Sequence, residues 1–533
     1  MLRSSHSAHV DMFTRDNLPL VEHWPELQFF SLGISYGDRL NCATELLQGH
    51  GGDRPCLITP SRTYTYADIR ALSGQIAYVL VDGHGLVPGN RVLLHGRNTA
   101  VLVASWLACL RAGLVVVTTA PQLSGAELGH IAKTAEVNFA LVQDDLEAVI
   151  PTADVGGHLT FSDLADCAER EGSEFHDVDT AADDVALLAF TSGTTGKPKA
   201  TMHFHRDVLA IADTFSAQVL RTRPDDVFAG TPPLGFTFGL GALVVFPMRA
   251  GAASLLLERA TPDVLLDAVV ENGVTQLFTA PTAYRKMLDQ ISGPIPGLRI
   301  CVSAGEPMTE HTWNDWRDAT GIRIVNGIGT TEMLHIFLST DPSTRSPAGA
   351  LGSAVPGYQV SILDDQWQPV PSGDTGYLAV RGPTGCRYLA DSRQSGYVRN
   401  GWNVTGDLCV RDGDGHIWYR SRADDMIITA GYSVAPAEVE MALLQHSAVV
   451  DCVVVGVPDH TRTMLIKAVV VLRSRAGHAV SVDALREHCR GILAAYKVPH
   501  EIEIVESVPR TSTGKVQRFR LRNPDADALR PSE

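Results

Sequence analysis

The sequence of 533 residues lacks an excess of positive charge. Lysine and arginine together number 44 against 60 aspartates and glutamates, which gives a formal net charge of −16. Proteins that bind nucleic acid or anionic membrane surfaces through bulk charge usually carry a strongly basic face. We therefore expect neither nucleic acid nor a membrane among the partners of this protein.

Paired cysteines and long uninterrupted apolar runs are also missing. The nine cysteines are scattered without a Cys-x-x-Cys pair, so we expect small buried side chains in a reducing compartment. The most apolar window, 101–120, contains Arg111 and Gly113 and is interpreted as a buried helix followed by a strand. The first residues lack the apolar segment of a secretory signal, and the expected location is the cytoplasm.

The length and the hydrophobic pattern predict more than one domain. A chain of 533 residues exceeds what a single hydrophobic core usually supports. Apolar runs at 91–94, 114–117 and 139–142 alternate with segments of helical periodicity, which is typical of layered α/β domains. A second strand–helix series begins near residue 264, and the part of the chain after residue 426 has the size of a small α+β domain.

The most informative segment, 191–199, reads Thr-Ser-Gly-Thr-Thr-Gly-Lys-Pro-Lys and follows the apolar run 185–190. Glycines allow backbone N–H groups to point inward and hydroxyl groups add donors, so this composition predicts a phosphate-binding loop. A Walker loop is excluded because the glycine spacing is shorter and Pro198 stands where that motif needs Ser or Thr. The predicted ligands are Thr191, Ser192, Gly193, Thr194, Thr195, Gly196 and Lys197.

Two later segments place polar groups after predicted strands. The apolar run 300–303 leads into Ala304, Gly305 and Glu306, and residues 324–325 lead into a predicted glycine-rich turn at 326–330. In open α/β sheets, ligands bind beyond the carboxyl ends of the strands. The sheet edge formed by the carboxyl ends of these predicted strands is therefore well placed for a nucleotide base.

Two histidines at 203 and 205 have a spacing that could suit zinc on a strand. No cluster of cysteine, histidine and carboxylate with ligand spacing lies nearby in the sequence. We therefore prefer a packing or loop-positioning role for His203 and His205. The segment 231–241, rich in proline, glycine and phenylalanine, has two interpretations: a turn of the hydrophobic core or one wall of a ligand pocket.

Taken together, these motifs resemble those of the adenylate-forming superfamily, which includes acyl-CoA ligases, adenylation domains of peptide synthetases and luciferases. The resemblance rests on the loop 191–199, Gly-Ile-Gly-Thr-Thr-Glu at 327–332, Thr-Gly-Asp at 405–407, Arg-Ala-Asp at 422–424 and Pro-Arg-Thr-Ser-Thr-Gly-Lys at 509–515. The segments 8–11, 24–26, 233–239 and 327–337 look most like benzoate–CoA ligases, in particular 2-aminobenzoate–CoA ligases.

The resemblance implies an AMP-forming acid–thiol ligase that uses ATP, Mg²⁺ and CoA. Such an enzyme forms an acyl-adenylate and pyrophosphate, and a thiol then displaces AMP. By resemblance Lys515, Thr331 and Glu332 are catalytic, Glu332 also being the Mg²⁺ ligand, while Asp407 and Arg422 contact the ribose. The remaining implied nucleotide contacts are Ala304, Gly305, Glu306, Asn326, Gly327, Ile328, Gly329 and Thr330.

The implied acyl pocket departs from the common family pattern at two places. The histidine that many relatives carry within 231–241 is absent, and Ile328 stands where an aromatic residue is frequent. The implied pocket residues suggest a flat, short apolar slot. The expected substrate is therefore benzoate or an ortho-substituted benzoate, with 2-aminobenzoate favoured. The implied lining residues are Phe236, Thr237, Phe238, Gly239, Ala304, Gly305, Ile328, Gly329 and His335.

The resemblance also divides the chain. Residues 1–421 would form an AMP-binding domain of two related βα subdomains and a smaller β subdomain. Residues 422–426 would be a hinge with Asp424 as pivot, and 427–533 a mobile α+β domain. One alternative is an adenylation enzyme that loads the phosphopantetheine of a carrier protein; another is an inactive aryl-acid-binding homologue, which the retained motifs argue against. The sequence is compatible with a monomer or an oligomer.

Overall fold

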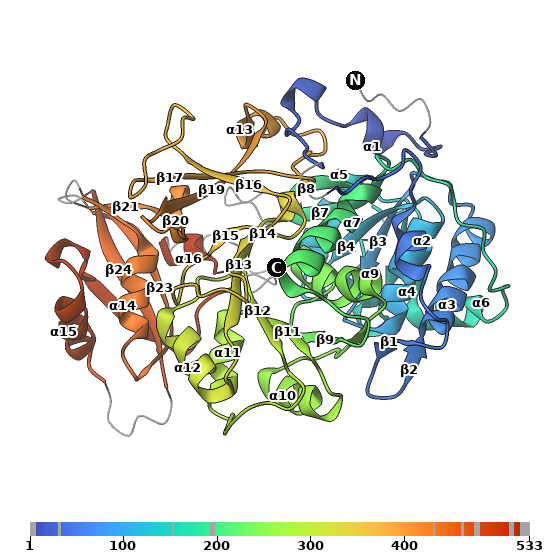
Figure 1. Cartoon of the computed structure of the whole chain (residues 1–533). Helices are drawn as coiled ribbons and strands as arrows, with labels where there is room; N and C mark the ends of the chain where they lie inside the picture. The colour runs from blue at the N-terminus through green and yellow to red at the C-terminus, as the bar shows by residue number, and fades with distance from the viewer. Residues whose placement is uncertain are drawn as a thin grey trace.

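The computed structural model describes residues 7–29, 33–151, 154–191, 198–429, 432–459, 463–473, 480–510 and 516–522. Figure 1 shows the blue-to-yellow part of the chain forming the larger body and the orange-to-red part lying at one end of the molecule. Short N-terminal helices, α1 (Phe13–Asp16) and α2 (Cys42–Leu47), pack on the larger body.

A six-stranded sheet in the order β6-β5-β3-β4-β7-β8 forms one half of the larger body. Its strands are parallel except β8, which pairs antiparallel with β7. The apolar run before the phosphate loop is β7, as expected, and its first five residues are buried. The elements are α3 (Tyr66–Tyr78), η3 (Val79–Gly83), β3 (Arg91–His95), α4 (Ala100–Arg111), β4 (Val115–Thr119), α5 (Gly125–Ala135), β5 (Phe139–Val142), η4 (Asp144–Val149), β6 (His158–Thr160), α6 (Phe161–Ala168), β7 (Val185–Thr191) and β8 (Lys199–Phe204).

A nine-stranded sheet in the order β15-β14-β13-β12-β11-β9-β10-β1-β2 forms the other half, so the expected pair of βα subdomains is present. Its central strands are parallel, and antiparallel strands close both edges. The elements are β1 (Pro55–Ile58), β2 (Thr63–Thr65), α7 (His205–Ile211), η5 (Ala212–Leu220), β9 (Val227–Gly230), α8 (Thr237–Leu240), η6 (Gly241–Val245), α9 (Phe246–Ala250), β10 (Ala253–Leu255), α10 (Pro262–Glu271), β11 (Gln276–Thr279), α11 (Pro281–Leu288), β12 (Ile300–Ser303), α12 (Glu310–Thr320), β13 (Ile324–Gly329), η7 (Thr331–Met333), β14 (Ile336–Ser339) and β15 (Ser353–Ala354).

The glycine-rich segment 326–330 is not the turn that the sequence predicts. Residues 326–329 continue β13, residues 327–329 pair with β14, and the chain turns only at 330–334. The absence of side chains explains this pairing, because a Cβ at Gly329 would lie 2.5 Å from the backbone oxygen of His335. A Cβ at Gly327 would lie 2.9 Å from the side chain of Ile336. The glycines thus allow two backbones to approach closely.

The smaller β subdomain and the α+β C-terminal unit have the expected composition. An antiparallel five-stranded sheet comprises β16 (Gln359–Leu363), β17 (Thr375–Arg381), β18 (Val398–Arg399), β19 (Trp402–Arg411) and β20 (Ile417–Arg422), with α13 (Gln394–Tyr397) beside it. The C-terminal unit has its own apolar core. Its elements, with the linking η8 (Ala423–Asp425), are β21 (Ile427–Thr429), β22 (Tyr432–Val434), α14 (Pro436–Leu444), β23 (Val449–Asp459), β24 (Thr463–Leu472), α15 (Val482–Ile492), η9 (Ala495–Lys497), β25 (Glu501–Val505) and α16 (Arg518–Arg522).

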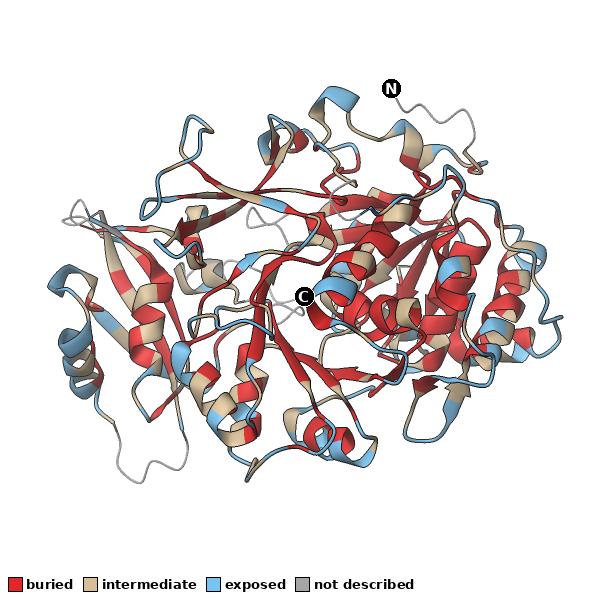
Figure 2. Ribbon diagram, in the orientation of Figure 1, coloured by how far each residue is buried: buried red, intermediate tan, exposed pale blue. Residues whose placement is uncertain are grey.

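Burial follows the layers of the fold. Figure 2 shows buried residues along the strands and on the inward sides of the helices of the larger body. The window 101–120 forms the buried helix α4 and the strand β4, as its composition predicts. No helix among the described residues is long and apolar enough to cross a membrane. All nine cysteines lie in the described ranges; none is paired, and eight are buried.

Candidate active site

The two ends of the predicted phosphate loop are held together. Ser192–Lys197 and Lys515 lie outside the described residues. Thr191, at the end of β7, pairs with Lys199, at the start of β8, in an antiparallel register. The loop therefore leaves and re-enters the carboxyl edge of the six-stranded sheet at neighbouring points.

The predicted metal ligand, Glu332, follows β13 in the 3₁₀ turn η7. The Thr330 hydroxyl caps this turn by accepting a hydrogen bond from the backbone N–H of Met333 at 3.2 Å. The ring Nε2 of His203 lies 2.9 Å from the carbonyl oxygen of Thr331 and supports the turn from the neighbouring sheet. Only 8% of Glu332 is exposed. The turn is thus fixed on both sides of the carboxylate.

The carboxylate of Glu332 has a neutral partner that the sequence did not reveal. The phenol of Tyr388 donates a hydrogen bond to Glu332 Oε1 at 2.6 Å, and Lys199 Nζ donates to the same phenol oxygen at 3.3 Å. Burial, reinforced by the carboxylate, raises the pKa of Tyr388, so the phenol keeps its proton. No sequence pattern separates Tyr388 from the other tyrosines of this region, because its role depends on pairing between distant segments.

Glu306, which the resemblance assigns to the adenine site, follows the adjacent strand β12. Its carboxylate accepts from Arg510 Nη1 of the C-terminal unit at 2.6 Å and from the hydroxyl of Thr282. Arg510 also donates to Asp451 at 2.8 Å. The described partners of this carboxylate are therefore a cation and a hydroxyl, and its charge helps to dock the C-terminal unit.

The two predicted ribose contacts lie side by side. Asp407 on β19 pairs in register with Arg422 on β20, and Arg422 Nη1 lies 3.2 Å from Asp407 Oδ1. Arg422 Nη1 also donates to the carbonyl of Thr405 at 2.9 Å. The carboxylate of Asp424, the predicted pivot, lies 3.5 Å from Arg422 Nε. The structure therefore places a carboxylate and a guanidinium next to each other, and their contact with the ribose stays a prediction.

The predicted acyl pocket contains a buried histidine among aromatic rings. The ring centroid of His335 lies 5.6 Å from that of Phe238, 4.5 Å from Phe246 and 5.7 Å from Phe215. A Cβ at Gly241 would lie 2.4 Å from the His335 ring, so this glycine makes room for it. Neither ring nitrogen makes a hydrogen bond of normal geometry with the described residues, although the backbone of Phe238 lies close enough to counteract part of the effect of burial on the pKa of His335. Burial lowers the pKa of His335 to about 3, so the ring is neutral.

The other predicted pocket residues lie at the same edge. Phe236, Thr237 and Phe238 are half-buried at the start of α8, and Gly239 packs against the backbone of Pro233. Ala304 and Ile328 lie at the ends of β12 and β13, and Gly305 and Gly329 next to them are exposed. Phe238 also contacts Phe278 at a centroid distance of 5.9 Å.

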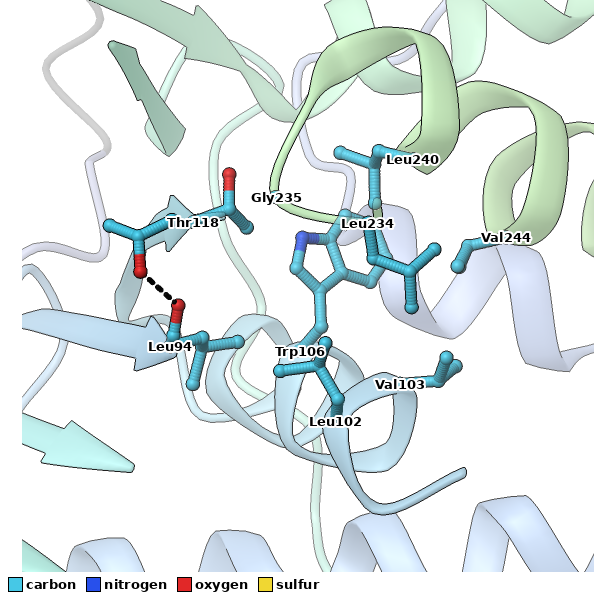
Figure 3. Close-up of a pocket in the computed structure, with 10 residues that line it drawn as sticks. Leu94, Leu102, Val103, Trp106, Thr118, Leu234, Gly235, Leu240 and Val244 are labelled. Carbon is cyan, nitrogen blue, oxygen red and sulfur yellow. Dashed lines mark hydrogen bonds between the residues drawn. The ribbon is translucent and has the colours of Figure 1, made fainter. Parts of the chain in front are cut away.

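A small apolar cavity lies behind this segment but is too small for an aryl acid. Figure 3 shows Trp106 between Leu234 and Leu102, with Gly235 and Leu240 nearby. The cavity holds about 10 Å³, which is the space of about one water molecule. The indole N–H of Trp106 has no hydrogen-bond partner in the described part of the chain. We therefore do not assign this cavity to the substrate.

The described residues contain no group of three or more histidine, cysteine, aspartate or glutamate side chains that could hold a metal ion. Burial lowers the pKa of His203 to about 4 and that of His205 to about 3. Cys42 Sγ lies 3.2 Å from Nδ1 of His205. Both histidines are therefore packed side chains, as preferred above.

Comparison with protein families decides the classification. Residues 45–388 match the family described as AMP-binding enzyme, and residues 438–515 match the AMP-binding enzyme C-terminal domain. The first match covers more than half of the chain. The chain belongs to the AMP-binding enzyme family. The expected superfamily and the α/β fold class are thereby confirmed.

Several AMP-binding enzymes resemble the chain over nearly its full length. A benzoate–CoA ligase of Thauera aromatica is 32% identical over 92% of this chain and 97% of its own. A 4-hydroxybenzoate–CoA/benzoate–CoA ligase of Rhodopseudomonas palustris is 30% identical over 95% and 96%. The structure of an anthranilate CoA ligase in complex with anthranoyl-AMP has a TM-score of 0.88 at 30% identity, covering 93% of this chain and 99% of that one.

The family match, together with relatives named as CoA ligases over nearly the full chain, identifies an AMP-forming acid–thiol ligase that uses ATP, Mg²⁺ and CoA. Glu332 suits Mg²⁺, because it offers a hard carboxylate oxygen and forms no ion pair among the described residues. A single protein carboxylate is also a normal Mg²⁺ environment, since the ion usually keeps waters and substrate phosphates as its other ligands. The individual roles of the site residues remain predictions.

Proposed function

We propose that this protein converts benzoate-sized aryl acids to their CoA thioesters, with an ortho-substituted benzoate such as 2-aminobenzoate as the preferred substrate. Relatives named as benzoate–CoA and hydroxybenzoate–CoA ligases support the aryl acid. Two solved structures support the same class of substrate: the anthranilate CoA ligase and a benzoate CoA ligase from Burkholderia xenovorans. The benzoate CoA ligase has a TM-score of 0.82 and 29% identity, and the match covers 91% of this chain and 100% of that one. A cytoplasmic location agrees with the nine unpaired cysteines.

The observation that carries the proposal is the neutral His335 ring enclosed by Phe238, Phe246 and Phe215. Aromatic and aliphatic walls favour a flat apolar ring over a flexible chain. A buried imidazole without a hydrogen bond of normal geometry can accept from an amino group or donate to a hydroxyl group at low desolvation cost. An ortho substituent on the substrate ring would supply such a group.

The reaction has two steps with different electrostatic demands. First, the substrate carboxylate attacks the α-phosphorus of ATP, forming acyl-AMP and releasing pyrophosphate. This step brings two anions together, so the loop 191–197 and Lys515 would stabilise the phosphates, and Asp407 with Arg422 would orient the ribose. Mg²⁺, held at Glu332, would supply charge neutralisation of the phosphates. Second, the CoA thiol attacks the acyl carbonyl and AMP leaves.

The two steps require two arrangements of the C-terminal unit, because Lys515 and the thiol need the same approach. We place the moving domain at 427–533, the hinge at 422–426 and the static domain at 1–421. The pivot at Asp424 predicts that Asp424→Pro, which fixes φ near roughly −65°, impairs one half-reaction much more than the other. Equal loss in both half-reactions, with a lowered melting temperature, would indicate misfolding and contradict the pivot.

A panel of carboxylic acids tests the substrate. Pyrophosphate exchange measures adenylation, and thioester formation with free CoA measures the whole reaction. We expect benzoates to exceed octanoate, and 2-aminobenzoate to exceed benzoate. His335→Phe should reduce the preference for 2-aminobenzoate over benzoate by about tenfold, since a lost polar contact costs ~1–3 kcal/mol. A higher catalytic efficiency on octanoate would reject the proposal; exchange without free-CoA turnover would indicate a carrier-protein acceptor.

A further inference from the structure

We propose that Tyr388 is a positioning residue that orients Glu332 for the metal–nucleotide complex while leaving its negative charge intact. The inference rests on the proposed ATP-dependent activation and adds to it a residue that none of the motifs contains. Tyr388 lies 56 residues after Glu332, in the smaller β subdomain between β17 and α13.

Two hydrogen bonds fix the orientation of the Tyr388 hydroxyl group. Its oxygen accepts from Lys199 Nζ at 3.3 Å, and its own proton is directed to Glu332 Oε1 at 2.6 Å. Lys199 Nζ also lies 4.9 Å from the centroid of the Tyr388 ring. Lys199 begins β8 immediately after the phosphate loop. One hydroxyl group therefore connects the strand that leaves the phosphate loop with the predicted metal ligand.

The backbone of Tyr388 cannot shift freely. Segment 387–389 extends the edge of β8, because Met202 N–H donates to the Arg387 carbonyl at 2.8 Å and Leu389 N–H donates to Ala200 at 2.9 Å. The side-chain oxygen of Gln394 accepts the N–H of Tyr388 at 2.8 Å. Tyr388 itself is 0% exposed. The position of the hydroxyl is therefore set by the sheet.

A second tyrosine supports the same turn. The Tyr397 ring contacts Tyr388 edge-on at a centroid distance of 5.7 Å, and its hydroxyl lies 3.3 Å from the Thr330 hydroxyl. Thr330 caps the turn that carries Glu332. The pair of tyrosines thus contacts both ends of the segment 330–332.

The chemistry of the contact favours a role beyond packing. An arginine or lysine at this place would orient Glu332 but also neutralise it and compete with a cation for its oxygens. A phenol hydrogen bond fixes one oxygen, Oε1, and leaves Oε2 without a hydrogen-bond or ion-pair partner among the described residues. Partners of this kind commonly tune metal affinity by orienting the ligating carboxylate.

Titration calorimetry of ATP binding to the purified full chain tests this role. Binding is measured with Mg²⁺ and again with a chelator, and no aryl acid is present. We expect Tyr388→Phe to reduce the Mg²⁺-dependent increase in ATP affinity by roughly 10-fold, as loss of such a partner typically does. ATP affinity in the chelator should stay within about twofold of the wild-type value, since ATP then makes no contact through Glu332.

Tyr66→Phe is a matched control, because Tyr66 is a buried tyrosine whose hydroxyl donates to the Ala252 carbonyl at 2.8 Å, away from the site. It should leave both affinities unchanged. A double-mutant cycle adds a stricter test: in a Glu332→Gln background, Tyr388→Phe should have little further effect. An equal loss of ATP affinity with and without Mg²⁺, or an undiminished effect in the Glu332→Gln background, would overturn the inference.

The outcome is independent of the substrate proposal. If no aryl acid is activated but Mg²⁺-dependent ATP binding responds as expected, the substrate is wrong and the role of Tyr388 stands. If aryl acids are activated but Tyr388→Phe leaves the Mg²⁺ dependence unchanged, the substrate stands and the role of Tyr388 is rejected. A wild-type chain that binds ATP equally with and without Mg²⁺ rejects the inference too.

Discussion

Glu306 and Glu332 occupy comparable places and have different partners. Each follows one of two adjacent parallel strands, β12 and β13, at the edge where AMP-binding enzymes are expected to hold the nucleotide. Glu306 pairs with the guanidinium of Arg510 from the C-terminal unit. Glu332 is held by the neutral phenol of Tyr388.

The difference shows how two carboxylates at one edge can serve different purposes. A guanidinium cancels most of the charge of Glu306, so this side chain suits domain docking. A phenol leaves Glu332 anionic, so this side chain suits a cation. The nature of the partner, rather than the carboxylate itself, separates the two roles.

The strongest test of this comparison is the matched pair Glu332→Gln and Glu306→Gln. Both substitutions keep the size of the side chain and remove its charge. We expect Glu332→Gln to lower the rate of pyrophosphate exchange by ~10²–10³, as for the loss of one preorganised electrostatic stabiliser. Glu306→Gln should lower it by no more than ~10-fold, because it weakens a docking contact. Equal losses would abolish the distinction.

The second test examines whether Arg510 is needed only for the first step, in which acyl-AMP forms, and not for the second, in which the thiol attacks. Arg510 lies five residues before Lys515 in the sequence, so its pairing with Glu306 anchors the start of that segment. Arg510→Ala should slow acyl-AMP formation by roughly 5- to 20-fold, a typical loss for a partly buried contact that couples two units. Conversion of supplied acyl-AMP and CoA should stay within about twofold.

Exchanging the charges provides the control for Arg510. Glu306→Arg combined with Arg510→Glu should recover part of the adenylation rate, since it restores the ion pair with reversed polarity. Asp451 would then face a carboxylate, so recovery should be incomplete. A double variant no better than the worse single variant would show that the pair is not the anchor.

The third test uses acid, which acts on buried histidines of the larger body, among them His203 beside the turn that carries Glu332. Four buried histidines of the larger body, His95, His203, His205 and His335, have pKa values lowered by burial to about 4, 4, 3 and 3. Below pH ~6.5 the unfolded chain binds protons at these sites while the folded chain does not. The free energy of unfolding should therefore fall as the pH drops from ~6.5 toward ~4, by up to ~1.4 kcal/mol per pH unit for each histidine.

Urea unfolding at pH 7, 6 and 5 measures this effect. Carboxylates whose pKa is held low by partners, such as Asp226 beside Arg299, weaken the fold only at still lower pH. His335→Phe should make the free energy of unfolding less dependent on pH, by about the contribution of one histidine. A free energy of unfolding that stays constant between pH 7 and pH 5 would contradict this account.

The sequence was informative wherever function depends on consecutive residues. The segments 191–199, 330–332 and 405–407 could be recognised because each carries its chemistry within a few positions of a strand end. The alternation of apolar strands and helices likewise predicted two βα subdomains and the buried window 101–120. Local patterns thus predicted the fold class and the candidate nucleotide edge.

The sequence was uninformative wherever function depends on pairing at a distance. Tyr388 reaches Glu332 only because segment 387–389 adds to β8, and Arg510 reaches Glu306 only through the docking of the C-terminal unit. The glycines at 327 and 329 misled the prediction, because glycine permits close strand approach as well as turns. In each case a contact with a distant segment decides what the local sequence does.

The smallest expected effect comes from a more exposed ion pair between the two units, Arg473 with Asp289. Its side chains are 43% and 64% exposed, compared with 24% and 22% for Arg510 and Glu306, although its N–O distance is a similar 2.8 Å. Water and salt screen an exposed pair, so such pairs contribute only ~0–1 kcal/mol. Arg473→Ala should therefore change the adenylation rate by less than about threefold. A loss as large as that of Arg510→Ala would mean that docking in general, rather than the partner of Glu306, controls the first step.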